Sequence, residues 1–270
     1  MRILITNDDG IYAPGLWALV NELKDFAEVM VVAPDREQSA IGAGITLHHP
    51  LRVQKVRPEI PGIESYTIGG TPGDCAIMAI SHLAKGKLDL LVSGVNNGPN
   101  IGVDIFQSGT VGGALQGYLH GLSAIAISID EIDSRHIDVA AKVAGILIQK
   151  MERNITGQAY LLNVNIPAVP VAEIKGVRIT RLSTVGLADI VEEGHDGRRQ
   201  YYWLKYQKVN NSNNNVSRSS DAWAVSRHYI SITPLHKYLF GTAIGDLNGS
   251  ITGLLQDLKN PSQPRYEKES

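Results

Sequence analysis

The first 165 residues alternate apolar, strand-like runs with helical patterns, and no other feature of the chain constrains its fold as strongly. An order of this kind predicts a parallel sheet with helices on both faces. The strand-like runs are nearly continuous in Val, Ile and Leu, which suits strands that are covered on both sides. Strands are expected near 2–6, 28–33, 88–92, 124–129 and 160–164, and helices near 14–24, 72–84, 110–120 and 135–150.

An extra stretch interrupts this order between the second and third strands. Its apolar runs at 51–56 and 66–68 look like additional strands. Pro50, Pro58 and Pro61 place them at an edge of the sheet, because proline cannot donate a hydrogen bond to a neighbouring strand.

Beyond about residue 177 the sequence changes to β-like runs joined by Gly-rich and Asn-rich loops. These runs lie at 177–182, 201–206 and 228–233. The segment 210–215 holds five asparagines and predicts a solvated loop, and the tail from Pro261 is expected to be frayed. The last third of the chain therefore predicts a β-rich appendage and not another βα unit.

Composition limits the classes of protein and partner that fit the chain. Its 270 residues suffice for one large α/β domain, or for one domain with an appendage. No uninterrupted apolar stretch approaches the roughly 20 residues that span a bilayer, so we expect a soluble protein without a membrane partner. The formal net charge of −2 provides no basic field to attract long nucleic acids. A single cysteine, Cys75, and a strand-like amino terminus without the features of a secretory signal favour the cytoplasm.

Two adjacent aspartates, Asp8 and Asp9, follow the first apolar run and precede Gly10. A central strand cannot bury neighbouring carboxylates without partners, since an unpaired buried charge costs many kcal/mol. The pair is therefore expected just beyond the end of the strand, facing a cation. A hard divalent ion such as Mg²⁺ or Mn²⁺ prefers oxygen ligands and commonly takes one or two carboxylates from a protein. The alternative is that one aspartate caps the next helix while the other forms a surface ion pair.

Three further polar clusters are expected at the same edge of the sheet, because ligands bind beyond the carboxyl ends of parallel strands. They lie at 35–39, 93–98 and 108–110. Ser39 and the Asn96 amide offer neutral oxygens that would complete a metal shell without adding negative charge. Four polar loops at one edge predict a binding site there.

The step Ser108-Gly109-Thr110 precedes a helical pattern, and backbone N–H groups at a helix start bind phosphate readily. A plain helix cap accounts for the same residues. Gly112 and Gly113 lower the helix propensity, which suggests a close approach of backbone or ligand. The segment 69–74 is a second candidate anion site, with Thr71 as a helix cap as the alternative.

Five motifs, in this order along the chain, resemble the SurE family of survival-protein phosphatases, also called 5'/3'-nucleotidases. They are Asn7-Asp8-Asp9-Gly10, Ala33-Pro34-Asp35 leading to Gln38-Ser39, Gly70-Thr71-Pro72, Ser93-Gly94-Val95-Asn96-Asn97-Gly98 and Ser108-Gly109-Thr110-Val111. The set covers about the first 115 residues, and 230–235 resembles the closing strand of the family. One departure is Ser219-Ser220-Asp221, where members tend to carry a Gly-Thr-Asp-like step.

The resemblance implies an α/β fold with a Rossmann-like, three-layer core of parallel strands in residues 1–176. Residues 177–270 would complete the same fold with a C-terminal β-rich arm and a terminal helix. The arm around 201–206 and the helix near 250–258 would then assemble homodimers or homotetramers.

The resemblance also implies a reaction, which is the metal-dependent hydrolysis of nucleoside 5'- and 3'-monophosphates to nucleoside and phosphate. One Mg²⁺ or Mn²⁺ ion per subunit would be held by Asp8, Asp9, Ser39 and Asn96, of which Asp8, Asp9 and Asn96 are expected to be catalytic. The expected phosphate contacts are Asn7, Gly42, Ser108, Gly109 and Thr110.

Other mechanisms and functions stay open from the sequence. The group that attacks phosphorus is either water or Asp8 itself. A haloacid-dehalogenase-like phosphatase also has an aspartate after its first strand, but it needs Asp-x-Asp and this chain has Asp-Asp. A non-catalytic nucleotide sensor would use the same edge of the sheet only to bind.

Overall fold

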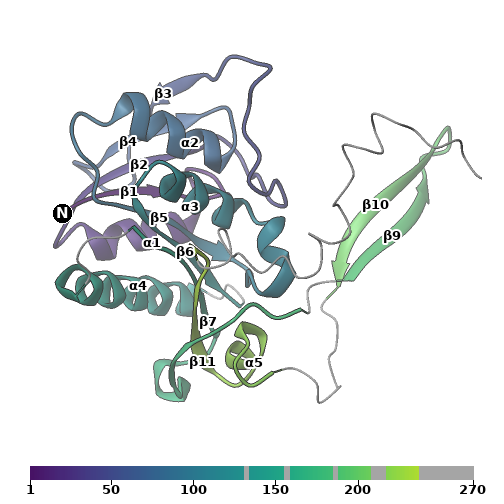
Figure 1. Ribbon diagram of the computed structural model, residues 1–270. Helices are drawn as coiled ribbons and strands as arrows, with labels where there is room; N and C mark the ends of the chain where they lie inside the picture. The colour runs from purple at the N-terminus through teal and green to yellow at the C-terminus, as the bar shows by residue number, and fades with distance from the viewer. Residues whose placement is uncertain (131–133, 155–158, 185–187, 208–216, 237–270) are drawn as a thin grey trace, which may run out of the picture. The chain divides into compact units, whose positions relative to one another are not determined.

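The structure of the protein is a computed structural model that describes residues 1–130, 134–154, 159–184, 188–207 and 217–236. Its centre is a nine-stranded sheet in the order β3-β4-β2-β1-β5-β6-β7-β11-β8 (Figure 1). The strands of this sheet are β1 Arg2–Thr6, β2 Glu28–Pro34, β3 Val53–Lys55, β4 Glu64–Ile68, β5 Leu90–Asn97, β6 Ser123–Ile129, β7 Leu161–Ile166, β8 Gly176–Ile179 and β11 Tyr229–Pro234. All neighbours from β4 to β7 are parallel, whereas β3 and β11 pair antiparallel with β4 and β7.

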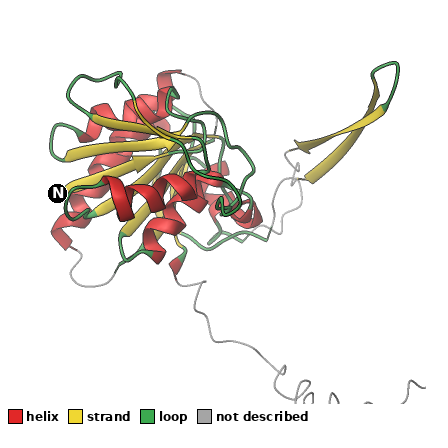
Figure 2. Ribbon diagram, turned by 90° about the horizontal axis from the view of Figure 1, so that it is seen from above, coloured by secondary structure: helices red, strands yellow, loops and turns green. Residues whose placement is uncertain are grey.

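Helices lie on both faces of this sheet (Figure 2). They are α1 Pro14–Leu23, α2 Pro72–Met78, α3 Gly109–Leu119, α4 Ser134–Asn154 and α5 Asp221–Ser226, with shorter turns η1 Ala79–Leu83, η2 Gly102–Phe106 and η3 Val171–Glu173. Successive side chains of a strand point to opposite faces, and β1 shows this directly. Ile3 and Ile5 join the buried cluster that holds α1 and α4 residues, whereas Leu4 joins the cluster of α2 and α3 residues. The predicted α/β fold with a mostly parallel central sheet is confirmed.

One prediction about the sheet is confirmed and another is wrong. The extra runs form β3 and β4, and β3 is an outermost strand as the prolines predicted. The expectation that Ser93 to Asn97 lie in a loop is wrong, because these residues continue β5 after a break in register. Strand β6 is long enough to pair with them, Asn96 with Ser128 and Asn97 with Ile129, so their backbone remains in the ladder.

The C-terminal part divides between the main sheet and a separate hairpin. Strands β8 and β11 extend the main sheet beyond β7. Strands β9 Ala188–His195 and β10 Gln200–Gln207 pair antiparallel with each other in a two-stranded sheet. The sequence predicted β10 but gave no signal for β9 or α5. The segments expected to form an Asn-rich loop (210–215) and a last helix (250–258) lie outside the described residues.

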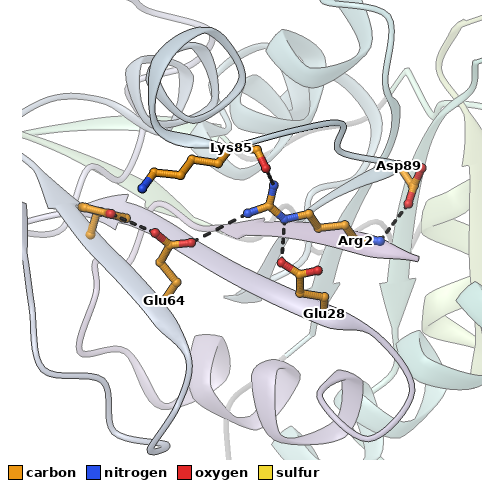
Figure 3. Close-up of polar contacts among 6 residues, drawn as sticks. Arg2, Glu28, Glu64, Lys85 and Asp89 are labelled. Atoms are coloured by element: carbon orange, nitrogen blue, oxygen red, sulfur yellow. Dashed lines mark hydrogen bonds and ion pairs between the residues drawn. The ribbon is translucent and has the colours of Figure 1, made fainter.

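At the amino-terminal ends of the strands, Arg2 forms ion pairs and hydrogen bonds with neighbouring segments (Figure 3). Its guanidinium pairs with Glu28 of β2 at 2.9 Å and with Glu64 of β4 at 3.7 Å, and it donates a 2.8 Å hydrogen bond to the carbonyl oxygen of Lys85. Its backbone N–H donates to the carboxylate of Asp89. Because Arg2 begins β1 and Asp8 follows its other end, this polar cluster and the predicted site lie at opposite edges of the sheet.

Candidate metal and phosphate site

Asp8 lies in the loop after β1 and contacts both the loop after β2 and the start of α3. Its side chain is 4% exposed, and its carboxylate accepts hydrogen bonds from the hydroxyl and the backbone N–H of Thr110. Its carbonyl oxygen accepts a 2.7 Å bond from the N–H of Gln38 in the loop after β2. Burial raises the pKa of Asp8 above its ordinary value, although the bonds from Thr110 oppose the shift. The loops after β1 and β2 and the start of α3 are thereby joined at one residue, through its backbone carbonyl oxygen and its carboxyl group.

Asn7 shapes the loop that carries the two aspartates. Its amide nitrogen donates to the carbonyl oxygen of Gly10 at 3.0 Å, and its amide oxygen accepts from the N–H of Gly10 at 3.2 Å. Gly10 has a φ of 96°, a left-handed conformation that glycine adopts without strain. Asn7, expected as a phosphate contact, is placed beside the pair and closes the turn around it.

Asp9 has a carboxyl group whose pKa is raised well above its ordinary value. Burial, then the charge of Asp8 and more weakly that of Glu37, raises the pKa of Asp9 to about 7, while the N–H of Asn97 donates to its carboxylate and opposes the shift. Two neighbouring carboxyl groups with raised pKa values indicate a position where the ionised forms need a cation. The carboxylate, amide and hydroxyl oxygens of this edge are the donors that Mg²⁺ and Mn²⁺ prefer. The residues present therefore fit a divalent ion.

Neutral oxygens would have to complete such a metal shell. In the part of the chain that the structure describes, no group of three His, Cys, Asp or Glu side chains is placed to hold a metal ion. Asn96 donates its amide nitrogen to the carbonyl oxygen of Gly98 at 2.7 Å, so its amide oxygen is the atom suited to a cation. Ser39 is exposed and donates its hydroxyl to Glu37 at 2.7 Å. This bond uses the hydroxyl proton of Ser39, so the hydroxyl oxygen keeps its lone pairs for a cation.

The start of α3 is packed directly against Asp8. A Cβ atom added at Gly109 would lie 2.8 Å from the Cβ of Asp8 and 3.2 Å from the carbonyl oxygen of Gln38. Ser108 caps the helix by accepting a 3.1 Å bond from the N–H of Val111. The helix cap is thus confirmed for Ser108. Thr110 contacts the carboxyl group of Asp8, and phosphate binding by this motif stays a prediction.

The loop after β2 also lies against α3. A Cβ atom at Gly112 would lie 2.3 Å from the carbonyl oxygen of Gly42, which confirms the close backbone approach expected there. The N–H of Gly42 donates to the carbonyl oxygen of Gln107 at 2.9 Å. Gly42 is buried with a φ of 62°, and Gly113 meets the side chains of neighbouring core residues. The structure brings Gly42 to the same helix start as Ser108, Gly109 and Thr110.

The second candidate anion site, at 69–74, is a helix cap. Thr71 accepts from the N–H of Asp74, and Asp74 accepts from the N–H of Thr71. Asp74 also accepts bonds of 2.8 and 2.6 Å from the N–H and hydroxyl of Thr46. This carboxylate fixes the end of the loop that carries Ser39 and Gly42, and Cys75 beside it is fully buried.

A buried asparagine network supports the site and was missed from the sequence. Asn163 and Asn165 of β7 both donate to the carbonyl oxygen of Asn100, at 2.7 and 2.9 Å, and Asn165 accepts from the N–H of Asn100. The Asn100 amide donates to the hydroxyl of Ser128 at 2.8 Å. The sequence does hold a signal for this network, since two asparagines alternate with apolar residues in a strand expected to be buried. Buried amides need hydrogen-bond partners, so such a pair indicates a buried polar network. The network anchors the segment between β5 and α3.

Comparisons with known proteins agree with this geometry. The family model described as "Survival protein SurE" matches residues 3–188. A protein named 5'-nucleotidase SurE from Dehalococcoides mccartyi strain CBDB1 is 46% identical over 254 residues, covering 93% of this chain and 95% of the relative. Another of that name from Syntrophomonas wolfei is 42% identical over 239 residues, covering 87% of this chain and 89% of the relative.

A solved structure shows the same fold. The crystal structure of the SurE protein from Aquifex aeolicus matches with a TM-score of 0.76 and 34% identity, covering 96% of this chain and all of that one. The family model covers well over half of the chain, and the relatives match it nearly end to end. The chain therefore belongs to the SurE family.

Proposed function

We propose that this protein is a 5'-nucleotidase, a metal-dependent phosphomonoesterase that hydrolyses nucleoside 5'- and 3'-monophosphates to nucleoside and phosphate. The observation that carries the proposal is the pair Asp8-Asp9, held at the start of α3 with raised pKa values. The relatives with the same fold are named 5'-nucleotidase SurE. These names support a phosphatase and do not favour the haloacid-dehalogenase-like alternative.

The side chains would divide the work between the cation and the phosphoryl group. Asp8, Asp9, Asn96 and Ser39 would hold one Mg²⁺ or Mn²⁺ ion per subunit, and a bound divalent ion supplies a Lewis acid that neutralises phosphoryl charge. The remaining phosphoryl contacts would come from the loop and helix start described above, namely Asn7, Gly42, Ser108, Gly109 and Thr110. Backbone N–H groups at a helix start stabilise charge on phosphoryl oxygens, but those of Gly42 and Thr110 already bond Gln107 and Asp8 and would have to exchange these partners.

The reaction exchanges one bond at phosphorus for another. The oxygen of the attacking group bonds to phosphorus, the bond to the ester oxygen breaks, and a proton passes to the leaving nucleoside oxygen. With water as the nucleophile this completes turnover in one step. With Asp8 as the nucleophile, an aspartyl phosphate forms first and is then hydrolysed. A rapid acid quench that traps phosphate on the protein would establish the second route, and its failure would favour water.

The deciding experiment measures phosphate release from a panel of nucleoside 5'- and 3'-monophosphates, with Mn²⁺, with Mg²⁺ and with a chelator. We expect release that depends on the metal and is abolished in Asp9→Asn. Nucleotide binding without metal-dependent release would instead identify a sensor. Full activity after chelation would overturn the proposed role of the cation.

We also propose that the molecule works as a homodimer or homotetramer, with residues 1–176 as its catalytic core and 177–270 as the region that completes the same fold and supplies the oligomerisation arm. The hairpin of β9 and β10 exposes apolar side chains on both of its faces, Tyr201 and Trp203 on one and Tyr202 and Leu204 on the other. A lone two-stranded hairpin is marginally stable in water, so a second copy of the chain is its expected cover.

The assembly can be tested by light scattering after size-exclusion chromatography. Trp203 is 62% exposed, and Trp203→Ser should shift the protein toward monomer. Val171→Ser replaces a side chain of equal exposure (62%) in η3, which is not part of the hairpin, and should leave the mass unchanged. A wild-type monomer would refute the proposed assembly.

We propose a cytoplasmic location on the grounds given by the sequence. The chain has one cysteine, Cys75, so no disulfide can form within it, and this cysteine is buried. None of the helices that the structure describes has both the length and the apolar character needed to cross a bilayer. Fractionation of cells that express the protein, with a membrane and a periplasmic or secreted marker, would test this location.

A further inference from the structure

A fully buried carboxylate other than the aspartate pair bonds three backbone segments. Asp221, the first residue of α5, accepts a 2.8 Å bond from the N–H of Gly102 on one oxygen. Its other oxygen accepts 2.8 Å bonds from the N–H groups of Ser183 and Ala222. The residues it joins lie 119 and 38 positions away in sequence. A buried carboxylate is costly unless it is hydrogen-bonded, and these N–H groups are its compensation.

The segment held through Gly102 leads directly to the start of α3. Gly102 begins η2, which ends at Phe106, and Gln107 then accepts the bond from Gly42. Ser108 follows and caps α3. The asparagine network fixes this segment at Asn100, and Asp221 fixes it two residues later, so the geometry of the helix start depends on both anchors.

The segment held through Ser183 belongs to the C-terminal part of the chain. Ser183 lies between β8 and β9, and the backbone around Arg181 forms a bridge with Ser220 next to Asp221. One carboxylate therefore contacts both the loop that leads to α3 and the chain that leads to the hairpin. The two segments bond different oxygens of the same rigid carboxyl group, so a movement of the group with one segment must change its bond with the other.

We propose that Asp221 is a positioning residue for the phosphate site, and that it couples the chain around Ser183 to the start of α3. It acts through Gly102 and does not touch the substrate. The inference rests on the proposed function, because it assigns the helix start of α3 to phosphate. It also predicts an effect on the binding of inorganic phosphate, which does not depend on turnover.

The first test compares Asp221→Asn with Ser220→Ala. The amide has one acceptor oxygen in place of two, and its NH₂ group would face a backbone N–H, so one of the two long-range bonds is lost. We expect the KM for a monophosphate and the inhibition constant of inorganic phosphate to rise together by roughly tenfold, the loss of about one charge-assisted hydrogen bond.

Ser220→Ala is the matched control from the same helix. Its hydroxyl accepts from the N–H of Trp223 at 3.2 Å and does not bond Gly102 or Ser183. This variant should melt at a lower temperature with KM and the phosphate inhibition constant unchanged. If Asp221→Asn also lowers only the melting temperature or the active fraction, its role is structural and the proposal is overturned.

A second measurement uses the wild-type protein and needs no variant to fold. Hydrogen exchange is followed in the peptides that contain Gly102 and Ser183, with and without inorganic phosphate. Coupling through Asp221 predicts slower exchange of both amides when phosphate is bound. Slowing at Gly102 alone would overturn the coupling. A wild-type protein that binds phosphate in this way but releases none from nucleotides would contradict the proposed function and leave the inference standing.

Discussion

Thr110 donates both its hydroxyl and its backbone N–H to the carboxylate of Asp8, which lies 102 residues earlier in the chain. The N-terminus of α3, predicted as a phosphate site, therefore already holds one anion. This contact favours the ionised form of a carboxyl group that is nearly fully buried, because its two donors oppose the burial that raises the pKa of Asp8. The proposed positions of the divalent cation and of the phosphate group therefore both lie next to the side chain of Asp8.

Removing the Thr110 hydroxyl tests this relationship. In Thr110→Val the shape is kept and the donor is lost, so the pKa of Asp8 should rise further, a smaller fraction of Asp8 should be ionised, and a cation should bind less well. We expect roughly tenfold weaker Mn²⁺ binding by calorimetry and a matching fall in kcat/KM. Thr110→Ser retains the donor and should stay within about threefold of wild type. Equal effects of Val and Ser would show that the methyl group, and not the hydroxyl, is what matters.

The close packing of Gly109 against Asp8 gives a second prediction. A methyl group in Gly109→Ala would meet Asp8 at 2.8 Å and must displace the aspartate or the helix start. We expect kcat/KM to fall more than about tenfold, since small displacements at a reacting centre are costly. Gly117→Ala in the same helix would meet Leu91 at 2.8 Å and serves as the control. It should lower the melting temperature while the activity per folded molecule is retained.

The raised pKa values predict an unusual pH dependence of the metal-free protein. Between about pH 4 and pH 7 the carboxyl group of Asp9 is protonated in the folded protein and ionised in the unfolded chain. The folded state then binds more protons, so the contribution of Asp9 to the free energy of unfolding falls as the pH rises through this range. Asp8 and Asp221, whose pKa values burial also raises, act in the same direction. Thermal melts in a chelator from pH 5 to pH 8 should show this loss, and Asp9→Asn should reduce it.

Added metal should counteract this loss of stability with rising pH. A divalent ion binds the ionised carboxylates, so the apparent affinity for Mn²⁺ should increase up to about pH 7 and binding should release protons. The increase in melting temperature that saturating Mn²⁺ causes should then become larger as the pH rises over the range in which the metal-free protein loses stability. A Mn²⁺ affinity independent of pH would argue against Asp9 as a ligand.

The sequence predicts the core of this fold and the edge of the site because both follow from local patterns. The apolar runs at 2–6 and 28–33 are confirmed as β1 and β2, and Asp8 follows β1 as expected. Ser93 to Asn97 were misassigned because polar residues indicate a loop only when they are solvated, and here β6 pairs with their backbone. Asp221 could not be recognised, since its partners are backbone N–H groups that carry no signature in sequence. What was missed depends on contacts between distant segments.

Arg2 supplies a prediction for the opposite edge of the sheet. Its side chain is 13% exposed, whereas that of its partner Glu28 is 71% exposed, so the ion pair between them is screened by water. The bond from Arg2 to the carbonyl oxygen of Lys85 and the packing of its aliphatic stem should carry most of the stabilisation. Arg2→Met is therefore expected to lower the free energy of unfolding by about 1 to 2 kcal/mol, and Glu28→Gln by less than about 0.5 kcal/mol, in denaturant titrations. Both should leave KM unchanged, because the Arg2 cluster and Asp8 lie at opposite ends of β1. A loss of substrate affinity in Arg2→Met without a loss of stability would show instead that the two edges of the sheet communicate.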